Sequence, residues 1–430
     1  MIAETNLLIA SVIRSFGGVL LAILILLAMV TIHEFGHYVA GKILGFKINE
    51  FSVGFGPAIF KKRSKKTGEL FALRIIPLGG YCAFDGEDEG EEPEKPNQNE
   101  DEPFAELSSN EIAENVTLKE ETQASQEENE GGMYEAKAET PQTEYPEPKG
   151  IRFNDQAPWK RIIVLLAGAT MNYLLALFLL LIMFTTIGRP VYRVQVEYPE
   201  TPSTETTAVM TDSDTQQNAY LQTGDLILEI DGKAVYLVTD YIDILNNRKQ
   251  GDEIPVTVMR NEQEMQVILV LKADTAFVNM SDTNSLLKAM GIYGLSTTTQ
   301  QQGFFSSIGH SFTYSLKIGS TVLRSLGELL TGKMGLEAMG GPMTTIKVTS
   351  EAASSSLLSC LNIAAFIGVN LAVFNLLPIP ALDGSKVIFC IIEWIRRKPV
   401  NRNVEAMIHF IGIIFLFGFA IFVDLLQLWV

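Results

Sequence analysis

Two histidines and a glutamate lie within five residues of one another in the segment TIHEFGHYVA at residues 31–40: His33, Glu34 and His37. Residues i and i+4 of a helix lie on one face, so the two imidazoles can bind one metal ion. Glu34 lies beside them and can act as a general base, as in H-E-x-x-H zinc peptidases. The alternative is two buried histidines that only hydrogen-bond to neighbours, but an unpaired Glu34 in an apolar segment would be costly. The pattern therefore predicts a catalytic zinc site.

A catalytic zinc site needs a third protein ligand and one open position. We interpret the two remaining histidines, His310 and His409, as structural. In the segment NLLPIPALDG at residues 375–384, a charge-free run ends at Asp383, and two prolines interrupt a helix just before it. Taken by its spacing alone, Asp383 is either an ordinary helix terminus or a ligand that projects into a cavity.

The segments that carry these residues are largely apolar. A span needs about 20 residues, and four runs come near this length without Asp, Glu, Lys or Arg: Ser15 to Ile32, Ile162 to Gly188, the later part of Ala352 to Leu382, and Ala406 to Val423. We expect the first run to be a span and not a signal peptide, because no A-x-A-like site follows it and H-E-x-x-H lies where cleavage would fall. The fold class is therefore a polytopic α-helical membrane protein with about four transmembrane helices.

The net charge of −17 comes from one segment. Residues 85–148 contain 22 Asp and Glu against three Lys, a net charge of −19, which leaves +2 for the rest of the chain. This composition, with few aromatic residues, predicts a disordered insert that is a tolerated insertion more than a docking segment. Nothing in the sequence predicts nucleic-acid binding. The three cysteines have no metal-binding or redox spacing and are interpreted as small buried residues: Cys82, Cys360 and Cys390.

Lysine and arginine gather in two loops. The loop between the first two apolar runs carries them at residues 61–66 and 160–161, and the loop between the last two runs carries them at residues 396–402. The positive-inside rule places both loops in the cytoplasm. Both termini and the segment from about Val191 to Ser350 are then expected outside the cell, with the active site toward the cytoplasmic side.

The outer segment contains the pattern of a small folded module. The stretch LQTGDLILEIDGKAV at 221–235 predicts a turn, a strand at Leu226 to Ile230 and a hairpin signal at Asp231-Gly232. A short helix near 236–245 and strands near 254–259 and 265–271 follow. This order resembles a PDZ domain of bacterial envelope proteases, whose groove beside a strand edge can bind an extended peptide.

Residues 43–81 contain short β-like runs rich in glycine and proline, on either side of the basic loop. They predict a β-hairpin. Two interpretations remain open: a cytoplasmic connection between two spans, or a sheet edge that dips toward the membrane beside the active site.

Taken together, these motifs resemble the site-2 protease family, and within it the bacterial RseP/RasP-type branch. The resemblance rests on H-E-F-G-H, VGFGP at 53–57, PLGGY at 77–81, the PDZ-like segment and N-x-x-P-x-P-x-L-D-G, and covers nearly the whole chain except the acidic insert. It implies an intramembrane zinc endopeptidase with His33, His37 and Asp383 as Zn²⁺ ligands and Glu34 as general base. It further implies that substrate is contacted by Asn375, Pro378, Pro380, Gly79 and Gly80.

The resemblance also implies substrates and location: single-span proteins already trimmed by another protease, such as anti-sigma factors or remnant signal peptides, in the bacterial plasma membrane. The acidic insert matches no family role, and one PDZ-like segment is evident where the enterobacterial branch has two. Two alternatives remain, a membrane transporter of zinc or another cation and a catalytically inactive PDZ scaffold. The scarcity of intramembrane acids argues against the first, and the intact Glu34 against the second.

The sequence therefore divides into six expected parts. They are a first transmembrane helix with the β region (1–84), the acidic cytoplasmic insert (85–148), a second transmembrane helix (149–190), an extracytoplasmic α+β PDZ-like domain (191–300), a membrane-proximal helical segment (301–350), and the third and fourth transmembrane helices with the Asp383 motif (351–430).

Overall fold

The computed structural model of the chain describes residues 2–87, 145–196, 220–275, 283–333, 335–336 and 339–429, with side chains from residue 16 onward apart from a few positions. Most of the acidic insert, for which disorder is predicted, lies outside the described residues. Only its two ends, 85–87 and 145–148, are described.

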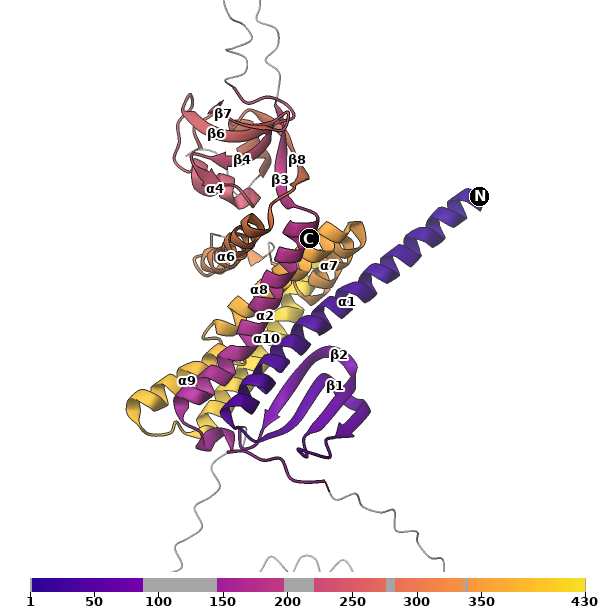
Figure 1. Cartoon of the computed structure of the whole chain (residues 1–430), viewed down its shortest axis with the longest axis vertical. Helices are drawn as coiled ribbons and strands as arrows, with labels where there is room; N and C mark the ends of the chain where they lie inside the picture. Colours follow the sequence, from indigo (N-terminus) through magenta and orange to yellow (C-terminus); the bar gives the residue numbers. More distant parts are fainter. Residues whose placement is uncertain are drawn as a thin grey trace, which may run out of the picture.

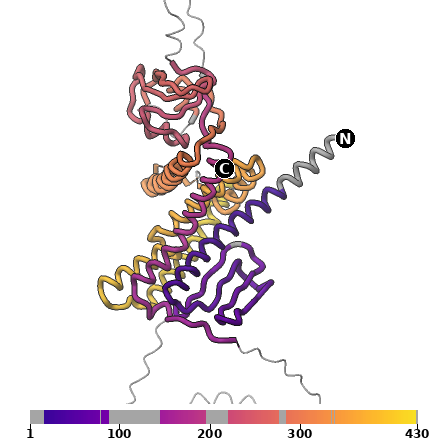
Figure 2. The backbone as a smooth tube through the Cα atoms, viewed as in Figure 1, coloured from indigo at the N-terminus to yellow at the C-terminus, as the bar shows by residue number. Residues whose placement is uncertain are grey.

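Within the described ranges, four helices are long and apolar enough to cross a membrane. They are α1 (Ile2–Leu44, apolar from Phe16), α2 (Pro158–Thr186), α8 (Leu357–Leu376) and α10 (Arg402–Trp429). The uncharged runs explain them, because in hydrocarbon only a helix satisfies its own backbone hydrogen bonds. Figures 1 and 2 show the four running side by side through the middle of the molecule. The prediction of about four spans is confirmed.

The segment after α1 forms an antiparallel hairpin of β1 (Ile48–Arg63) and β2 (Leu70–Phe84). It lies along the lower half of α1 in Figure 1. Its base packs on the bundle through buried aromatic side chains, with the rings of Phe46, Phe84 and Phe153 about 5.5 Å apart. The hairpin prediction is confirmed, and its strands are longer than the short runs that the sequence suggested.

A second sheet lies at the far end of the molecule from this hairpin (Figure 1). Among the described residues it contains β3 (Arg189–Val196), β4 (Leu226–Ile230), β5 (Lys233–Ala234), β6 (Glu253–Arg260), β7 (Gln263–Val270) and β8 (Ile292–Gln300), in the order β7-β6-β4-β3-β8 with β5 on β4. Helices α4 (Val238–Leu245) and α5 (Thr283–Ala289) complete it. The module predicted from residues 221–271 is present, and its helix and strands fall where the turn signals put them.

Helix α6 (Phe304–Leu330) lies crosswise between this sheet and the bundle, and α7 (Pro342–Ser355) follows it (Figure 1). The sheet is attached to α6 by an ion pair of 2.9 Å between Lys317 and Asp240 and by a hydrogen bond between Tyr236 and His310. Burial and the positive charge of Arg189 lower the pKa of His310, which keeps this imidazole neutral at neutral pH. The expected boundary at residues 350/351 falls inside α7.

The third span ends earlier than the sequence suggests. Helix α8 stops at Leu376, and an irregular loop at 377–382 leads to a separate helix, α9 (Asp383–Arg396). Asp383 is therefore the first residue of α9 and does not lie inside the third span. The reason is that Pro378 and Pro380 lack the N–H that a continued helix needs.

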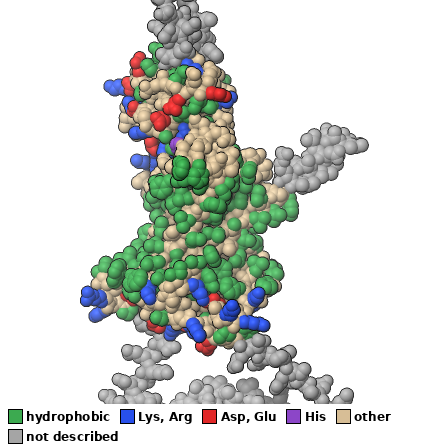
Figure 3. Space-filling model, viewed as in Figure 1, with side chains coloured by type: hydrophobic (Ala, Val, Ile, Leu, Met, Phe, Trp, Pro, Cys, Tyr) green, Lys and Arg blue, Asp and Glu red, His purple; other side chains and the backbone are tan. Residues whose placement is uncertain are grey.

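The surface divides into zones along the long axis. Figure 3 shows a broad apolar zone over the bundle, while Lys and Arg side chains gather at the end with the hairpin and at the sheet module. Large apolar side chains of α10 lie on this surface, including Phe410, Phe415 and Phe417, each more than half exposed. This distribution fits a helical bundle surrounded by lipid.

Candidate metal centre and active site

The structure brings two turns of α1 and the first residue of α9 together. His33 Nε2 and His37 Nε2 are 3.1 Å apart, and Asp383 Oδ2 lies 3.0 Å from the first and 3.3 Å from the second. Among the described residues, these three form the one group of His, Cys, Asp and Glu side chains able to share a metal ion. Residues 350 positions apart in the sequence thus supply one cluster.

The cluster fits zinc. Tetrahedral zinc with ligands at about 2.0–2.1 Å holds neighbouring ligand atoms about 3.3 Å apart, close to the observed triangle. Two imidazole nitrogens and a carboxylate oxygen are also a usual donor set for catalytic zinc. Asp383 Oδ2 is buried and accepts no well-formed hydrogen bond, as expected for an oxygen whose partner is a cation.

Each imidazole is oriented by the polar contacts of its other ring nitrogen, Nδ1. His37 Nδ1 donates to the carbonyl oxygen of Val164 on α2 at 2.8 Å, so its Nε2 is left with a free lone pair. His33 Nδ1 faces the side-chain amides of Asn172 and Asn375, both at 3.5 Å. An amide can be turned by 180° without changing its shape. Turning Asn172 pairs its buried, unpartnered Oδ1 with a proton on His33 Nδ1.

Helix α2 approaches the two imidazoles closely because residue 168 is glycine. A Cβ at Gly168 would overlap the ring of His37 and lie 2.7 Å from the ring of His33. Gly168 and Asn172 are one turn apart and face the same site. Sequence reasoning missed both residues. The signal was present in the second apolar run, where the polar Asn172 follows a glycine at i−4.

Glu34 lines a cavity of about 260 Å³ beside the metal cluster. The backbone of Cys82 on β2 provides a hydrogen bond to its carboxylate. The cavity is also lined by Gly79, Gly80, Asn172, Asn375 and Asp383. A carboxylate, a possible metal site and two asparagine amides thus converge on a space large enough for a peptide group and water.

The residues expected to contact substrate separate into two groups. Asn375, Gly79 and Gly80 line the cavity, so they are placed to touch a bound molecule. Pro378 and Pro380 are not among its lining residues. They shape the 377–382 loop instead, and Pro380 packs against Gly412 of α10.

The side chains interpreted as structural have definite partners. His310 bonds to Tyr236, as described above, and His409 accepts a hydrogen bond of 3.3 Å from the backbone N–H of Ala381. Among the cysteines, which are free thiols, Cys82 and Cys390 are buried as predicted, whereas Cys360 is only half-buried. Neither histidine belongs to the metal cluster.

The fold and the site define a class, a polytopic membrane protein with a possible metal centre between its apolar helices. The model of peptidase family M50 matches residues 21–419, so the chain belongs to this family. Similar proteins include the regulator of sigma-W protease RasP of Bacillus subtilis, 28% identical over 422 residues that cover 92% of this chain and 94% of the relative.

Two further relatives are both named zinc metalloprotease RasP. The protein of Bacillus licheniformis is 28% identical over 423 residues, covering 92% of this chain and 94% of its own. The protein of Oceanobacillus iheyensis is 27% identical over 421 residues, covering 89% and 92%. The expectation from the sequence is confirmed: the protein is an intramembrane zinc metalloprotease of the site-2 protease type, with Zn²⁺ as its cofactor.

Proposed function

We propose that His33, His37 and Asp383 hold the zinc ion, and that Glu34 is the general base for cleavage of peptide bonds inside transmembrane segments. The observation that carries this proposal is the triangle of ligand atoms, 3.0–3.3 Å on a side, next to a carboxylate and a cavity. It lies between the apolar helices, where an ionisable group is costly unless it serves a function.

The residues divide the reaction between them. A bound zinc ion polarises the scissile carbonyl and lowers the pKa of water at the site. Glu34 accepts the proton of the attacking water and returns it to the leaving amine. Asn375 is placed to donate its amide hydrogens to the developing oxyanion. Asn172 acts indirectly, because it orients the ring of His33.

The substrate class follows from where the site lies. A transmembrane helix hides its peptide bonds in i→i−4 hydrogen bonds, so the segment must unwind before water can attack. The β2 strand passes the cavity at Gly79 and Gly80, so an unwound segment can pair with the hairpin there. Single-span membrane proteins, already trimmed by another protease, are the substrates that fit such a site.

The orientation follows from the distribution of charge. The basic residues of the β1–β2 turn and of the α9–α10 connection lie at one end of the bundle, which we assign to the cytoplasm of a bacterial plasma membrane. The hairpin and the metal cluster then lie toward the cytoplasmic side. Both termini and the sheet module lie outside the cell.

We interpret the outer sheet module as PDZ-like, with a strand edge that can bind a peptide. Support comes from the antiparallel order β7-β6-β4-β3 and from helix α4 packed on the same core. Its attachment to α6 holds it over the outer end of the bundle, where it would admit substrates with small outer domains and exclude bulky ones.

Co-expression with tagged single-span proteins tests the proposed activity. Wild-type cells should convert a trimmed substrate into a shorter fragment, and cells with Glu34→Gln should accumulate it uncut. The matched control is Glu50→Gln, which changes a carboxylate of the same chain that is bonded to Arg74 outside the cavity. Equal cleavage by the Glu34 variant and the wild type would refute the assignment of the base.

A further inference from the structure

The loop that delivers Asp383 to the metal cluster is strained. Ala381, two residues before Asp383, has a φ of 80°, in the left-handed region that residues with a Cβ rarely adopt. Such a conformation persists only where surrounding contacts hold it. Because Ala381 sets the direction in which the chain enters α9, these contacts also set the position of Asp383.

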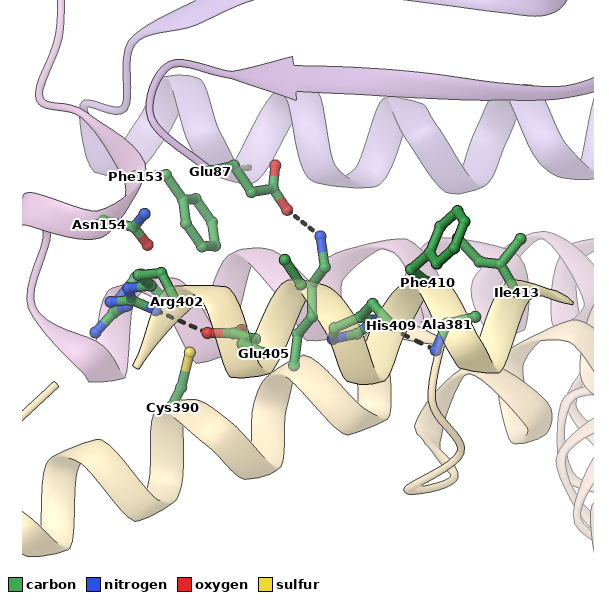
Figure 4. Close-up of a pocket in the computed structure, with 13 residues that line it drawn as sticks. Glu87, Phe153, Asn154, Ala381, Cys390, Arg402, Glu405, His409, Phe410 and Ile413 are labelled. Atoms are coloured by element: carbon green, nitrogen blue, oxygen red, sulfur yellow. Dashed lines mark hydrogen bonds and ion pairs between the residues drawn. The ribbon is translucent and has the colours of Figure 1, made fainter. Parts of the chain in front are cut away.

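One imidazole of α10 supplies such contacts on both sides of Asp383. The N–H of Ala381 donates to His409 Nδ1 at 3.3 Å, as the dashed line in Figure 4 shows. The ring proton is then on Nε2, which lies 3.5 Å from Ser385 Oγ. Ser385 Oγ in turn donates to the carbonyl oxygen of Leu382 at 2.8 Å. His409 thus contacts the residues two before and two after Asp383.

The backbone of α10 lies directly against the same loop. Gly412 is one turn beyond His409, and a Cβ there would overlap Pro380. Elsewhere on this helix, Phe417 is 70% exposed and lines neither cavity. The side of α10 that carries His409 and Gly412 therefore faces the loop, while the side chain of Phe417 faces outward.

Space is present on both sides of the loop. The metal-site cavity of about 260 Å³ and a second cavity of about 410 Å³ are both lined by Ala381. The larger one lies between α9 and α10, and Figure 4 shows His409 and Ala381 together at its wall. A strained loop next to such a volume has room to relax if its hydrogen bond is lost.

We propose that His409 is a positioning residue for the metal centre. It does not touch the metal cluster. By fixing Ala381 and Ser385, it keeps Asp383 Oδ2 at 3.0 and 3.3 Å from the two histidine nitrogens. This inference rests on the proposed ligand set of His33, His37 and Asp383.

The test measures zinc release from purified full-length protein in detergent, in the Glu34→Gln background, after addition of a coloured chelator. Supporting residues of metal sites typically change metal affinity by about 10–100-fold. His409→Phe keeps a ring but removes the polar contacts to Ala381 and Ser385, and should release zinc at least about tenfold faster. His409→Asn keeps an acceptor near the Nδ1 position and should restore most of the slow release. Phe417→Leu, on the outward side of α10, should match the parent protein.

Asp383→Ala in the same assay separates the two proposals. Loss of zinc in that variant, with parental release in His409→Phe, would overturn the role of His409 and leave the ligand set standing. Full zinc in Asp383→Ala would overturn the ligand set itself. A lower melting temperature of His409→Phe with unchanged zinc release would mean a purely structural residue, and would also overturn the inference. If that variant does not fold, Ser385→Ala must show faster release, and a parental rate there would refute the proposal.

Discussion

Gly168 on α2 lies so close to His37 on α1 that a methyl group would overlap the imidazole. A side chain at this position must therefore push the ring away from His33 and Asp383. We expect Gly168→Val to lower zinc content and activity by about tenfold or more, because the ligand triangle opens. Metal analysis of the purified variant checks this. Gly327→Val on α6, where a Cβ has open space, is the matched control, and full zinc occupancy in Gly168→Val would show that the helices can separate without harm.

Glu34→Gln keeps the shape of the side chain and removes its ability to take a proton. We expect activity to fall by about 10²–10⁴-fold, the usual contribution of a general base. Zinc content should stay at the wild-type level, because Glu34 contributes none of the three clustered ligand atoms. Comparison of turnover and zinc content in one preparation checks both parts; a variant that loses its zinc would make Glu34 a ligand instead.

Removal of zinc should abolish cleavage reversibly. A chelator that strips the ion leaves two imidazoles and a carboxylate converging without a cation, and the scissile carbonyl without polarisation. Adding Zn²⁺ back should restore the rate, whereas adding Mg²⁺ should not, because a site of two imidazoles and one carboxylate favours zinc. Undiminished cleavage after complete removal of zinc would contradict the proposed chemistry.

Replacement of residues 88–144 by a short Gly/Ser linker should leave insertion and core activity within about threefold of wild type, as expected for an acidic segment with few apolar residues. The residues that flank this segment are held by contacts that the replacement keeps. Glu87 forms an ion pair of 2.7 Å with Lys386, and the backbone N–H of Phe153 donates a hydrogen bond to the carbonyl oxygen of Asp85. Expression level and cleavage of a trimmed substrate are the measurements. Complete loss of proteolysis would show that the insert takes part in the reaction.

The outer module should act as a size filter. Deletion of residues 189–300 removes β3 and β8 together, so no unpaired strand of that sheet is left behind. If the module excludes bulky outer domains, the deleted protein should cleave an untrimmed substrate that the wild type leaves intact. If it recruits substrates through its groove, the trimmed substrate should instead remain uncut. Immunoblots of both substrates in both strains separate the two roles.

The sequence predicted that His33 and His37 lie together because the signal is local. H-E-x-x-H predicts two ligands and a base within about one helical turn, and the pattern of charge-free runs predicts the spans. Spacing alone left Asp383 undecided, and only the fold brings it to the two histidines. The pattern of apolar residues does not show that α9 begins at Asp383. The apolar run continues past the end of α8, because prolines and not a polar residue end that helix.

Contacts between distant segments could not be predicted from the sequence. Gly168 and Asn172 look like ordinary members of an apolar run until α2 is packed against α1. Strands β3 and β8 were missed for a similar reason. They pair with each other from residues about 100 positions apart, and the threonines and the one glutamine of β8 do not alternate with apolar residues.

The position of the cut in the substrate shows directly whether the enzyme hydrolyses peptide bonds inside a transmembrane segment. Purified enzyme with zinc is incubated with a trimmed single-span protein, and the masses of the products identify the bond that is hydrolysed. The proposed function predicts one or a few cuts inside the apolar span of the substrate, made by the wild type and absent with Glu34→Gln. Cuts confined to the segments outside that span, or equal cutting by the Glu34 variant, would contradict it.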